Sequence, residues 1–442
     1  MVAGAAVMAI VIPAARALAQ QNIPVIDLPS ASAKSGQTLG AVLGVRQVAG
    51  GKLLVNDAGR RQLKLFDSTL TTSTTVLDSV SGGANSYGRR PVPLVPYLGD
   101  SSLFADLNSR TVLVIDSRGQ IARALALPSP ATPSDLLSSS TGVDNKGRVI
   151  YLDRRRGMPK LKPTGGVGFD DSLPVMRADL DLRQVDSLGV VNRPLAKATA
   201  PTKAPNGTTF TMFAIDPLKT VDEVAVLTDG SIAFVRGQDY HIDWIRSDGG
   251  RVSTPKMPFD WKRLTDADKQ RLIDSTRTAQ NTLLAANQLE SEVTMMTRGD
   301  PTGGPPPGGG DRAGRGGGRG DGGGRGADPD AGALSEFGRG YLPRNAEVIP
   351  LNQIADYYPP IRLGATLPDL DGNLWILPTT SAQSKTGELV YDVVNSRGEL
   401  FERVRFPLGR LLAGFGKGGA VYMTSGDRTN GFYLERTQLP RR

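Results

Sequence analysis

The 442-residue chain has no cysteine and one histidine. The lack of cysteine excludes disulfides, thiolate metal sites and cysteine nucleophiles. A histidine-rich metal cluster is also excluded, and a Ser-His-Asp triad could use only His241. His241 lies in the alternating run 240–245, on the opposite side from Tyr240, Ile242 and Trp244, so we interpret it as a structural or surface residue. The G-x-S-x-G, P-loop and H-E-x-x-H motifs are absent as well.

The apolar N-terminal stretch, residues 3–15, is too short to span a bilayer and contains Pro13. The pattern Ala17-Leu18-Ala19 and two glutamines follow it. This arrangement predicts a signal peptide over residues 1–19, although no positive charge precedes the apolar stretch. We therefore expect a periplasmic or extracellular protein with no stable membrane span after cleavage. An uncleaved membrane anchor is the alternative.

The chain also lacks any run of five or more like charges. Its 52 basic and 44 acidic residues give a net charge of +8, but the two signs are interleaved. A diffuse excess of this kind is typical of a solubility property rather than of a nucleic-acid surface. We expect no nucleic-acid partner.

A short turn-and-strand pattern recurs in a chain rich in glycine and proline, which favours a turn-dense all-β fold. In each copy, Gly or Asp residues form a tight turn and a run of β-forming residues follows. The six copies are residues 50–57, 99–106, 145–153, 229–236, 371–377 and 418–424.

A second and a third strand follow most copies, and one strand precedes the glycine turn, as at residues 41–48. Four antiparallel strands in a repeat of about 45 to 50 residues are typical of a propeller blade. The sequence therefore predicts an all-β fold over residues 20–442: a six-bladed β-propeller with four-stranded antiparallel blades, one helical insertion and one disordered insertion. We expect it to be a monomer.

The last repeat lacks its outer strand, and residues 23–29 near the N-terminus resemble the proline-ended outer strands of other blades. We therefore expect the strand near 23–29 to complete the sixth blade and close the ring, which removes the exposed sheet edge.

An insertion over residues 258–350 interrupts the repeats. Thr265 and Asp268 have the spacing of a capping box, and apolar residues at helical spacing predict a helix over about 266–296. The apolar stripe of this helix is interrupted by Thr276 and Gln280. We expect the helix to pack on the propeller rim. Self-assembly through this helix is the alternative.

The Gly-, Pro- and Arg-rich segment over about 299–332 predicts a disordered linker. Arginine-glycine tracts bind RNA in some proteins, which is the alternative. Against it, the four arginines of the tract are matched by four aspartates and no aromatic residue lies among them.

Residues 51–57 and 62–67 resemble an NHL-type repeat, and residues 369–375 are similar to blade turns of bacterial propellers of the NHL, TolB and gluconolactonase-like group. The resemblance covers most of residues 23–255 and 355–440. It implies a six-bladed propeller and says little about activity, because propellers of this type serve as lactonases, lyases and binding scaffolds.

The resemblance to gluconolactonase-like propellers implies one route to catalysis, in which oxygen ligands from several blades hold a divalent cation such as calcium. Asp57, Asp106 and Asp153 follow the second strands of their blades and are the candidate metal ligands. Their recurrence at equivalent positions is equally typical of a shared structural turn. No other cofactor is expected.

Arginine and tyrosine residues gather in the loops on the face opposite the glycine turns. Such residues are frequent at recognition sites and suit carboxylate or sugar ligands, although pairing with neighbouring aspartates is the simpler interpretation. The candidate ligand-binding residues are Tyr87, Arg89, Arg90, Arg154, Arg155, Tyr357, Tyr358 and Arg362.

Together these observations favour an exported binding scaffold of the cell envelope that recognises a protein or an anionic small ligand on the loop side of the propeller. A metal-dependent hydrolase or lyase with its site at the central channel is the alternative. The catalytic residues of such an enzyme are unknown from the sequence.

Overall fold

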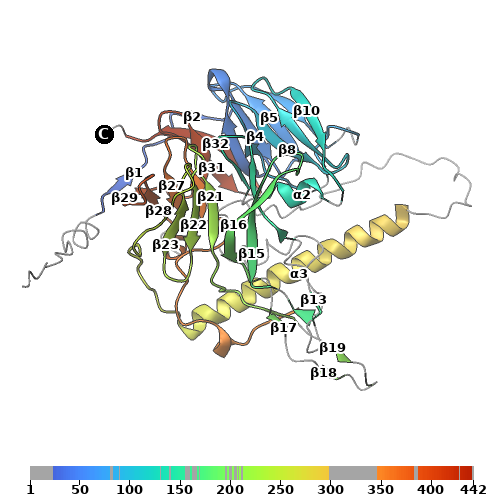
Figure 1. The fold of residues 1–442 in the computed structure, drawn as a ribbon, viewed down its shortest axis with the longest axis vertical. Coiled ribbons are helices and arrows are strands. Elements are labelled where there is room, and N and C mark those ends of the chain that lie inside the picture. Colours follow the sequence, from blue (N-terminus) through green and yellow to red (C-terminus); the bar gives the residue numbers. More distant parts are fainter. Residues whose placement is uncertain are drawn as a thin grey trace, which may run out of the picture.

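The structure, a computed structural model, describes residues 23–440 except for 80–82, 89, 130, 139–140, 155–159, 162–166, 169, 195–196, 199–201, 204–206, 208, 211–212, 298–345, 383–386 and 428. Strands dominate the fold, and they form six antiparallel four-stranded sheets arranged as the blades of a ring (Figure 1). The predicted all-β, six-bladed β-propeller is confirmed.

The first three blades follow one another along the chain, and the strands of each blade are adjacent in the order in which they are named. The first blade is β3 (Val42–Gln47), β4 (Leu53–Asp57), β5 (Gln62–Phe66) and β6 (Ser73–Leu77). The second is β7 (Val95–Pro96), β8 (Ser102–Asp106), β9 (Thr111–Ile115) and β10 (Ile121–Ala126). The third is β11 (Gly142–Val143), β12 (Val149–Leu152), β15 (Ser172–Ala178) and β16 (Val185–Asn192).

The other three blades complete the ring. The fourth is β21 (Glu223–Val226), β22 (Ile232–Arg236), β23 (His241–Ile245) and β24 (Arg251–Ser253). The fifth is β26 (Thr366–Pro368), β27 (Leu374–Ile376), β28 (Val390–Val394) and β29 (Leu400–Arg405). The sixth is β30 (Leu411–Gly416), β31 (Ala420–Asp427), β32 (Gly431–Gln438) and β2 (Ala33–Lys34).

The first strand of each blade lies innermost, because the first strands of neighbouring blades contact one another, as β3 does β30 and β21 does β26. A glycine-marked turn joins the first two strands of every blade. Gly230 and Gly372 in two of these turns adopt φ values of 85° and 86°, which only glycine accepts without strain. We call the side with these turns the turn face, and the opposite side, with the turns between second and third strands, the loop face.

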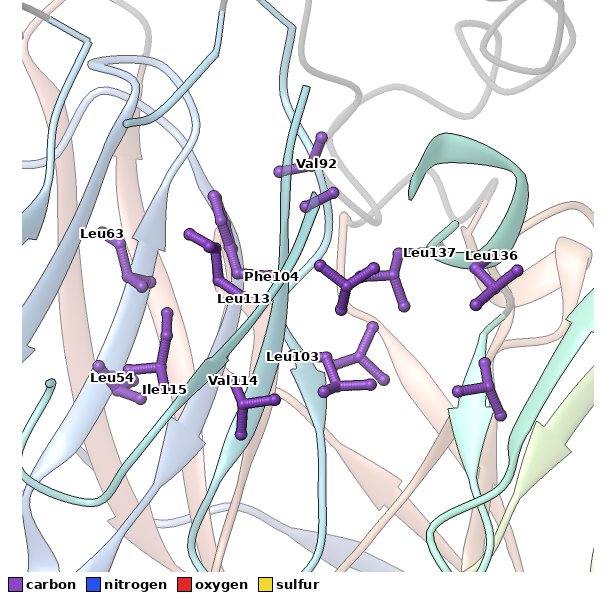
Figure 2. Packing of buried hydrophobic residues seen from close by; sticks show 14 of the residues in the cluster. Leu54, Leu63, Val92, Leu103, Phe104, Leu113, Val114, Ile115, Leu136 and Leu137 are labelled. Carbon is purple, nitrogen blue, oxygen red and sulfur yellow. The ribbon is translucent and has the colours of Figure 1, made fainter. Parts of the chain in front are cut away.

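The middle strands of the blades are buried on both faces, because each blade packs against two neighbours. All five residues of β4 and all five of β8 are buried. Figure 2 shows Leu54 of the first blade beside Ile115 of the second, and Leu103 on the side toward Leu136 and Leu137. Burial of each such apolar side chain contributes about 1.5–3 kcal/mol. This explains the apolar runs at residues 53–55 and 103–105 within these two strands.

The ring closes through a different strand from the one expected. Residues 23–29 were predicted to complete the sixth blade, but β1 (Val25–Asp27) pairs in parallel with β29 of the fifth blade as an additional outer strand. The sixth blade is completed by β2, which pairs antiparallel with β32. The sequence pattern indicates an outer strand, but the position of the chain in space decides which blade it joins.

The insertion between the fourth and fifth blades starts on the loop face. Helix α3 spans Asp266–Thr297, where the sequence predicted 266–296, and its first turn has the predicted capping box between Thr265 and Asp268. Thr276 and Gln280 are buried together with Leu272, so the positions interpreted as interruptions belong to the packed side of the helix. The expected disordered segment, 299–332, lies outside the described residues, as does the expected signal peptide.

A small core holds the described part of the insertion together. The first half of α3 packs against η4 (Leu351–Gln353) and β25 (Ala346–Val348). The Lys269 ammonium is buried at this contact, 2.6 Å from Asp356 Oδ1. The remaining short elements are η2 (Ala49–Gly51), α2 (Pro133–Leu136), β13 (Lys160–Leu161), β14 (Val167–Gly168), β17 (Lys197–Ala198), β18 (Thr202–Lys203), β19 (Thr209–Phe210), β20 (Phe213–Ile215) and α6 (Thr379–Ala382).

Candidate functional site

The carboxylate of Asp57, the first candidate metal ligand, is fully buried at the end of β4. Its Oδ1 accepts hydrogen bonds from the backbone amides of Gly40 at 2.9 Å, Ala41 at 3.1 Å and Arg60 at 3.1 Å. These amides satisfy the buried charge and fasten the β4–β5 turn to the segment that enters the blade.

Asp106 has the same role in the second blade. It is fully buried at the end of β8, and it accepts hydrogen bonds from the amides of Asn85 at 2.8 Å, Asn108 at 2.9 Å and Ser109 at 3.1 Å. Asp153, the third candidate, is half-buried just after β12. Among the residues that the structure describes, no three His, Asp or Glu side chains are placed to hold a metal ion.

Replacing Asp57 by alanine is expected to lower the free energy of unfolding by about 1–3 kcal/mol, because buried backbone amides lose their acceptor. Urea denaturation measures this change. The exposed Asp181 gives the control Asp181→Ala, with an expected change within about 0.5 kcal/mol. Calcium is expected to leave the stability of the wild-type chain unchanged. A calcium-dependent increase that Asp57→Ala abolishes would instead support a metal site.

In the fourth blade the turn after the second strand is also held to the connection that enters the blade, but here the carboxylate belongs to the connection and a basic residue ends the strand. Arg236 stands at the end of β22, where the first two blades have aspartate, and its Nη1 lies 2.8 Å from the carboxylate of Asp222. Asp222, in the connection entering the blade, also accepts a hydrogen bond from the amide of Gly237 at 3.1 Å. The recurring carboxylate therefore stabilises the fold. It can come from the end of the second strand, as in the first two blades, or from the connection that enters the blade, as in the fourth.

The described residues of segment 85–92, which are 85–88 and 90–92, lie on the loop face between the first and second blades. The buried phenol of Tyr87 donates a hydrogen bond of 2.8 Å to Asn56 Oδ1, and Asn56 Nδ2 donates one of 2.7 Å to the carbonyl of Val92. On the other side, Asn108 Nδ2 donates to Ser86 Oγ at 2.9 Å. Burial raises the pKa of the Tyr87 phenol, so Tyr87 anchors this segment as a neutral donor rather than as a surface contact.

Three exposed arginines surround this fixed segment. Arg90 belongs to the segment, Arg61 lies in the β4–β5 turn, and Arg110 lies in the β8–β9 turn close to Asn108. None of the three forms an ion pair with a carboxylate in the part of the chain that the structure describes. Arg89, the other candidate in this segment, lies outside the described residues.

The remaining candidate ligand-binding residues belong to other places. Arg154 is half-buried after β12, and Arg155 lies outside the described residues. Tyr358 is buried in the small core beneath α3, while Tyr357 is 46% exposed beside it. Arg362 Nη2 donates a hydrogen bond of 2.7 Å to the carbonyl of Pro217. The structure thus brings Tyr87 and Arg90 together and places the other described candidates elsewhere.

Sequence reasoning missed a buried ion pair between the third, fourth and fifth blades. Arg193 Nη2 lies 3.0 Å from Glu223 Oε1, and both side chains are almost completely buried. The same oxygen accepts a hydrogen bond of 2.9 Å from the amide of Gly364. A glutamate at the start of the otherwise apolar strand β21 was the one signal available.

His241 is half-buried on β23 between two carboxylates. Its Nδ1 lies 2.6 Å from Asp239 Oδ1, and its Nε2 lies 3.3 Å from Asp243 Oδ1. Asp243 also contacts Arg236 Nε at 2.8 Å. These contacts define a polar network on the fourth blade, and no nucleophile-base-acid geometry accompanies it among the described residues.

The class of protein that the fold defines is the six-bladed β-propeller. No family model and no curated protein matches the chain. Among solved structures, it is similar to a Bacteroides fragilis protein assigned as exported, with 9% identity and a TM-score of 0.42, covering 95% of this chain and 100% of that one.

Two further similarities are to proteins with named activities. Regucalcin from Agrobacterium tumefaciens, a calcium-binding protein, has 9% identity and a TM-score of 0.36, covering 95% of this chain and 97% of that one. A virginiamycin B lyase from Staphylococcus aureus has 9% identity and a TM-score of 0.36, covering 91% of this chain and 98% of that one. These values concern the fold and carry no argument about activity.

Proposed function

We propose that the protein is an exported binding scaffold that recognises an anionic group on the loop face, over the first and second blades. The residues that would contact the ligand are Arg61, Arg90 and Arg110. The proposal depends on one observation: these three guanidinium groups are exposed around one fixed segment without a carboxylate partner in the described part of the chain.

The chemistry of arginine supports this proposal. A guanidinium group presents a planar set of donors that matches carboxylate and phosphate oxygens, and it stays charged at all physiological pH values. Other exposed arginines in turns already have a partner, as Arg118 has Asp116 at 3.0 Å and Arg397 has Glu399 at 2.7 Å. Three unpaired cations on one surface attract an anion from solution.

The backbone of the two turns gives additional support. Arg61 and Arg110 adopt φ values of 53° and 57°, a conformation that strains residues other than glycine and asparagine. Tyr240 has the equivalent place in the fourth blade, with a φ of 52°, but its side chain is buried and its hydroxyl donates to Asp392 Oδ2 at 2.6 Å. Among the residues that the structure describes, the two strained arginines make no such buried contact, and contact with a ligand would offset their strain.

Export is part of the proposal and is supported by the signal-like residues 1–19. None of the helices in the described ranges is long and apolar enough to cross a bilayer. We also assign the chain, as a proposal, to the NHL, TolB and gluconolactonase-like group, on the turn sequences 51–67 and 369–375.

Reversing all three charges tests the proposal. The variant Arg61→Glu/Arg90→Glu/Arg110→Glu is expected to bind fluorescent poly-L-glutamate about 10 to 100 times more weakly than wild type, as measured by fluorescence anisotropy. The wild-type affinity is expected to fall as salt is raised, because exposed charges are screened.

A matched control changes the same charge elsewhere. Arg118, Arg183 and Arg397 are exposed and already paired, so Arg118→Glu/Arg183→Glu/Arg397→Glu is expected to change the affinity less than about threefold. Equal loss of binding in both variants would mean that the net charge, and not the loop face, attracts the polyanion. That result would overturn the proposed site.

A further inference from the structure

A polar cavity lies on the turn face, on the opposite side of the propeller from Arg61, Arg90 and Arg110. It has a volume of about 250 Å³ and opens between the third and fourth blades. Two glycine-marked turns and the β23–β24 turn form its walls. Its charged lining residues are Asp144, Lys146, Arg148, Arg177, Arg246 and Asp248.

The walls of this cavity are held in place without a ligand. Asn145 Nδ2 donates a hydrogen bond of 3.1 Å to the carbonyl of Asp229, which joins the glycine turns of the two blades. The guanidinium group of Arg246 lies 4.9 Å from the ring centre of Trp244 and donates to the carbonyl of Ser396 in the fifth blade. The cavity is therefore pre-formed, which lowers the entropy loss on binding.

Ion pairs balance only part of the charge of the lining. Arg148 is neutralised by Asp144 at 2.7 Å, and Arg177 by Asp186 at 2.9 Å. Lys146 and Arg246 have no carboxylate partner in the described part of the chain. Asp248 is the one remaining acid of the lining, and its Oδ1 already accepts a hydrogen bond of 2.8 Å from the amide of Gly250.

We propose that this cavity binds a small ligand carrying a phosphate or sulfate group, with Lys146 and Arg246 contacting the anion. Two basic side chains without an ion-pair partner, at a cavity of about 250 Å³, suit an oxyanion attached to a body of about sugar size. This site does not depend on the loop face, because the two surfaces share no residue.

The neighbouring cavity between the same blades is less suited to a ligand. It has a volume of about 280 Å³ and a partly apolar lining that includes Leu188, Phe234 and Trp244. Arg251 Nη2 donates to the carbonyl of Leu188 at 2.9 Å, and Arg236 Nη1 donates to that of Val190 at 2.9 Å. The two arginines thus hydrogen-bond to backbone carbonyls of the outer strand β16. A peptide that paired with this edge as an extra β-strand would need the same carbonyls as acceptors.

The test uses glucose 6-phosphate as the probe and isothermal titration calorimetry at constant ionic strength. Lys146→Glu is expected to weaken binding about tenfold or more. Because Lys146 is exposed, the variant is expected to fold normally, which circular dichroism checks. Arg246→Gln is expected to weaken binding in the same direction.

Four further measurements separate the explanations. Glucose is expected not to bind, and inorganic phosphate or sulfate is expected to compete with the probe. Lys52→Glu, an exposed lysine in the glycine turn of the first blade, is the matched control and is expected to change the affinity less than about twofold. The triple arginine variant of the loop face is expected to leave this binding intact, so failure of one site does not decide the other.

Equal weakening by Lys146→Glu and Lys52→Glu would mean that the turn face attracts anions without a site, and would overturn the proposal. Absence of heat with glucose 6-phosphate and of any shift in melting temperature with phosphate or sulfate would also overturn it.

Discussion

Replacing Glu223 by alanine is expected to lower the free energy of unfolding by about 3–5 kcal/mol, because it leaves the buried Arg193 without its countercharge. Arg193 and Glu223 are 2% and 3% exposed, and the distance between Nη2 and Oε1 is 3.0 Å. The substitution also removes the acceptor of the Gly364 amide. Urea denaturation monitored by circular dichroism measures the change.

The double variant Arg193→Met/Glu223→Leu tests this explanation. It replaces both charges by apolar groups and is expected to be more stable than Glu223→Ala, because no unpaired charge stays buried. If Glu223→Ala changes the stability by less than about 1 kcal/mol, the pair is solvated in solution and the contact between these blades is looser than a buried ion pair requires.

Removing the closing strand is expected to have the second large effect. A chain that begins at Gln37 lacks β2 and Ser35, and it is expected to lose about 5 kcal/mol of stability or to become insoluble, because β32 becomes an exposed edge. The amide of Ser35 donates to the carbonyl of Leu434 at 2.7 Å, and the amide of Leu434 donates to Ser35 Oγ at 3.0 Å. Urea denaturation and soluble yield measure the effect.

A shorter truncation is the matched control. A chain that begins at Asp27 lacks most of β1 but retains the buried Leu28, whose amide donates to the carbonyl of Arg405 at 2.9 Å. Because β1 is a short outer strand with two exposed residues, its loss is expected to cost less than about 2 kcal/mol. Similar midpoints for the two truncations would show that the ring closes without β2.

The sequence allowed the six blades to be predicted because their glycine turns and apolar strands are local features. The strand that closes the ring was assigned wrongly, since β1 and β2 are short and their partners are almost a whole chain length away. Pairing of such strands depends on where the ring brings them, which residue patterns do not contain.

The candidate site was predicted less well than the fold. The sequence placed the candidate residues around Arg90 in loops that follow or precede strands. It did not show which of their side chains are exposed or which form ion pairs. Tyr87, for instance, is 1% exposed, although its sequence neighbours are polar. The ion pair of Arg193 and Glu223 depends on contact between three blades, which the sequence does not show. Thr276 and Gln280 are buried although their side chains are polar.

The way the ring is fastened also bears on how the chain reaches its native state. The bond from Ser32 Oγ to the carbonyl of Arg436 joins residues separated by 404 positions. Contacts of such long range form late in folding, because the loop they close is almost the entire molecule. During synthesis, residues 32–35 cannot pair with β32 until that strand has left the ribosome. An incomplete polypeptide therefore cannot close the ring.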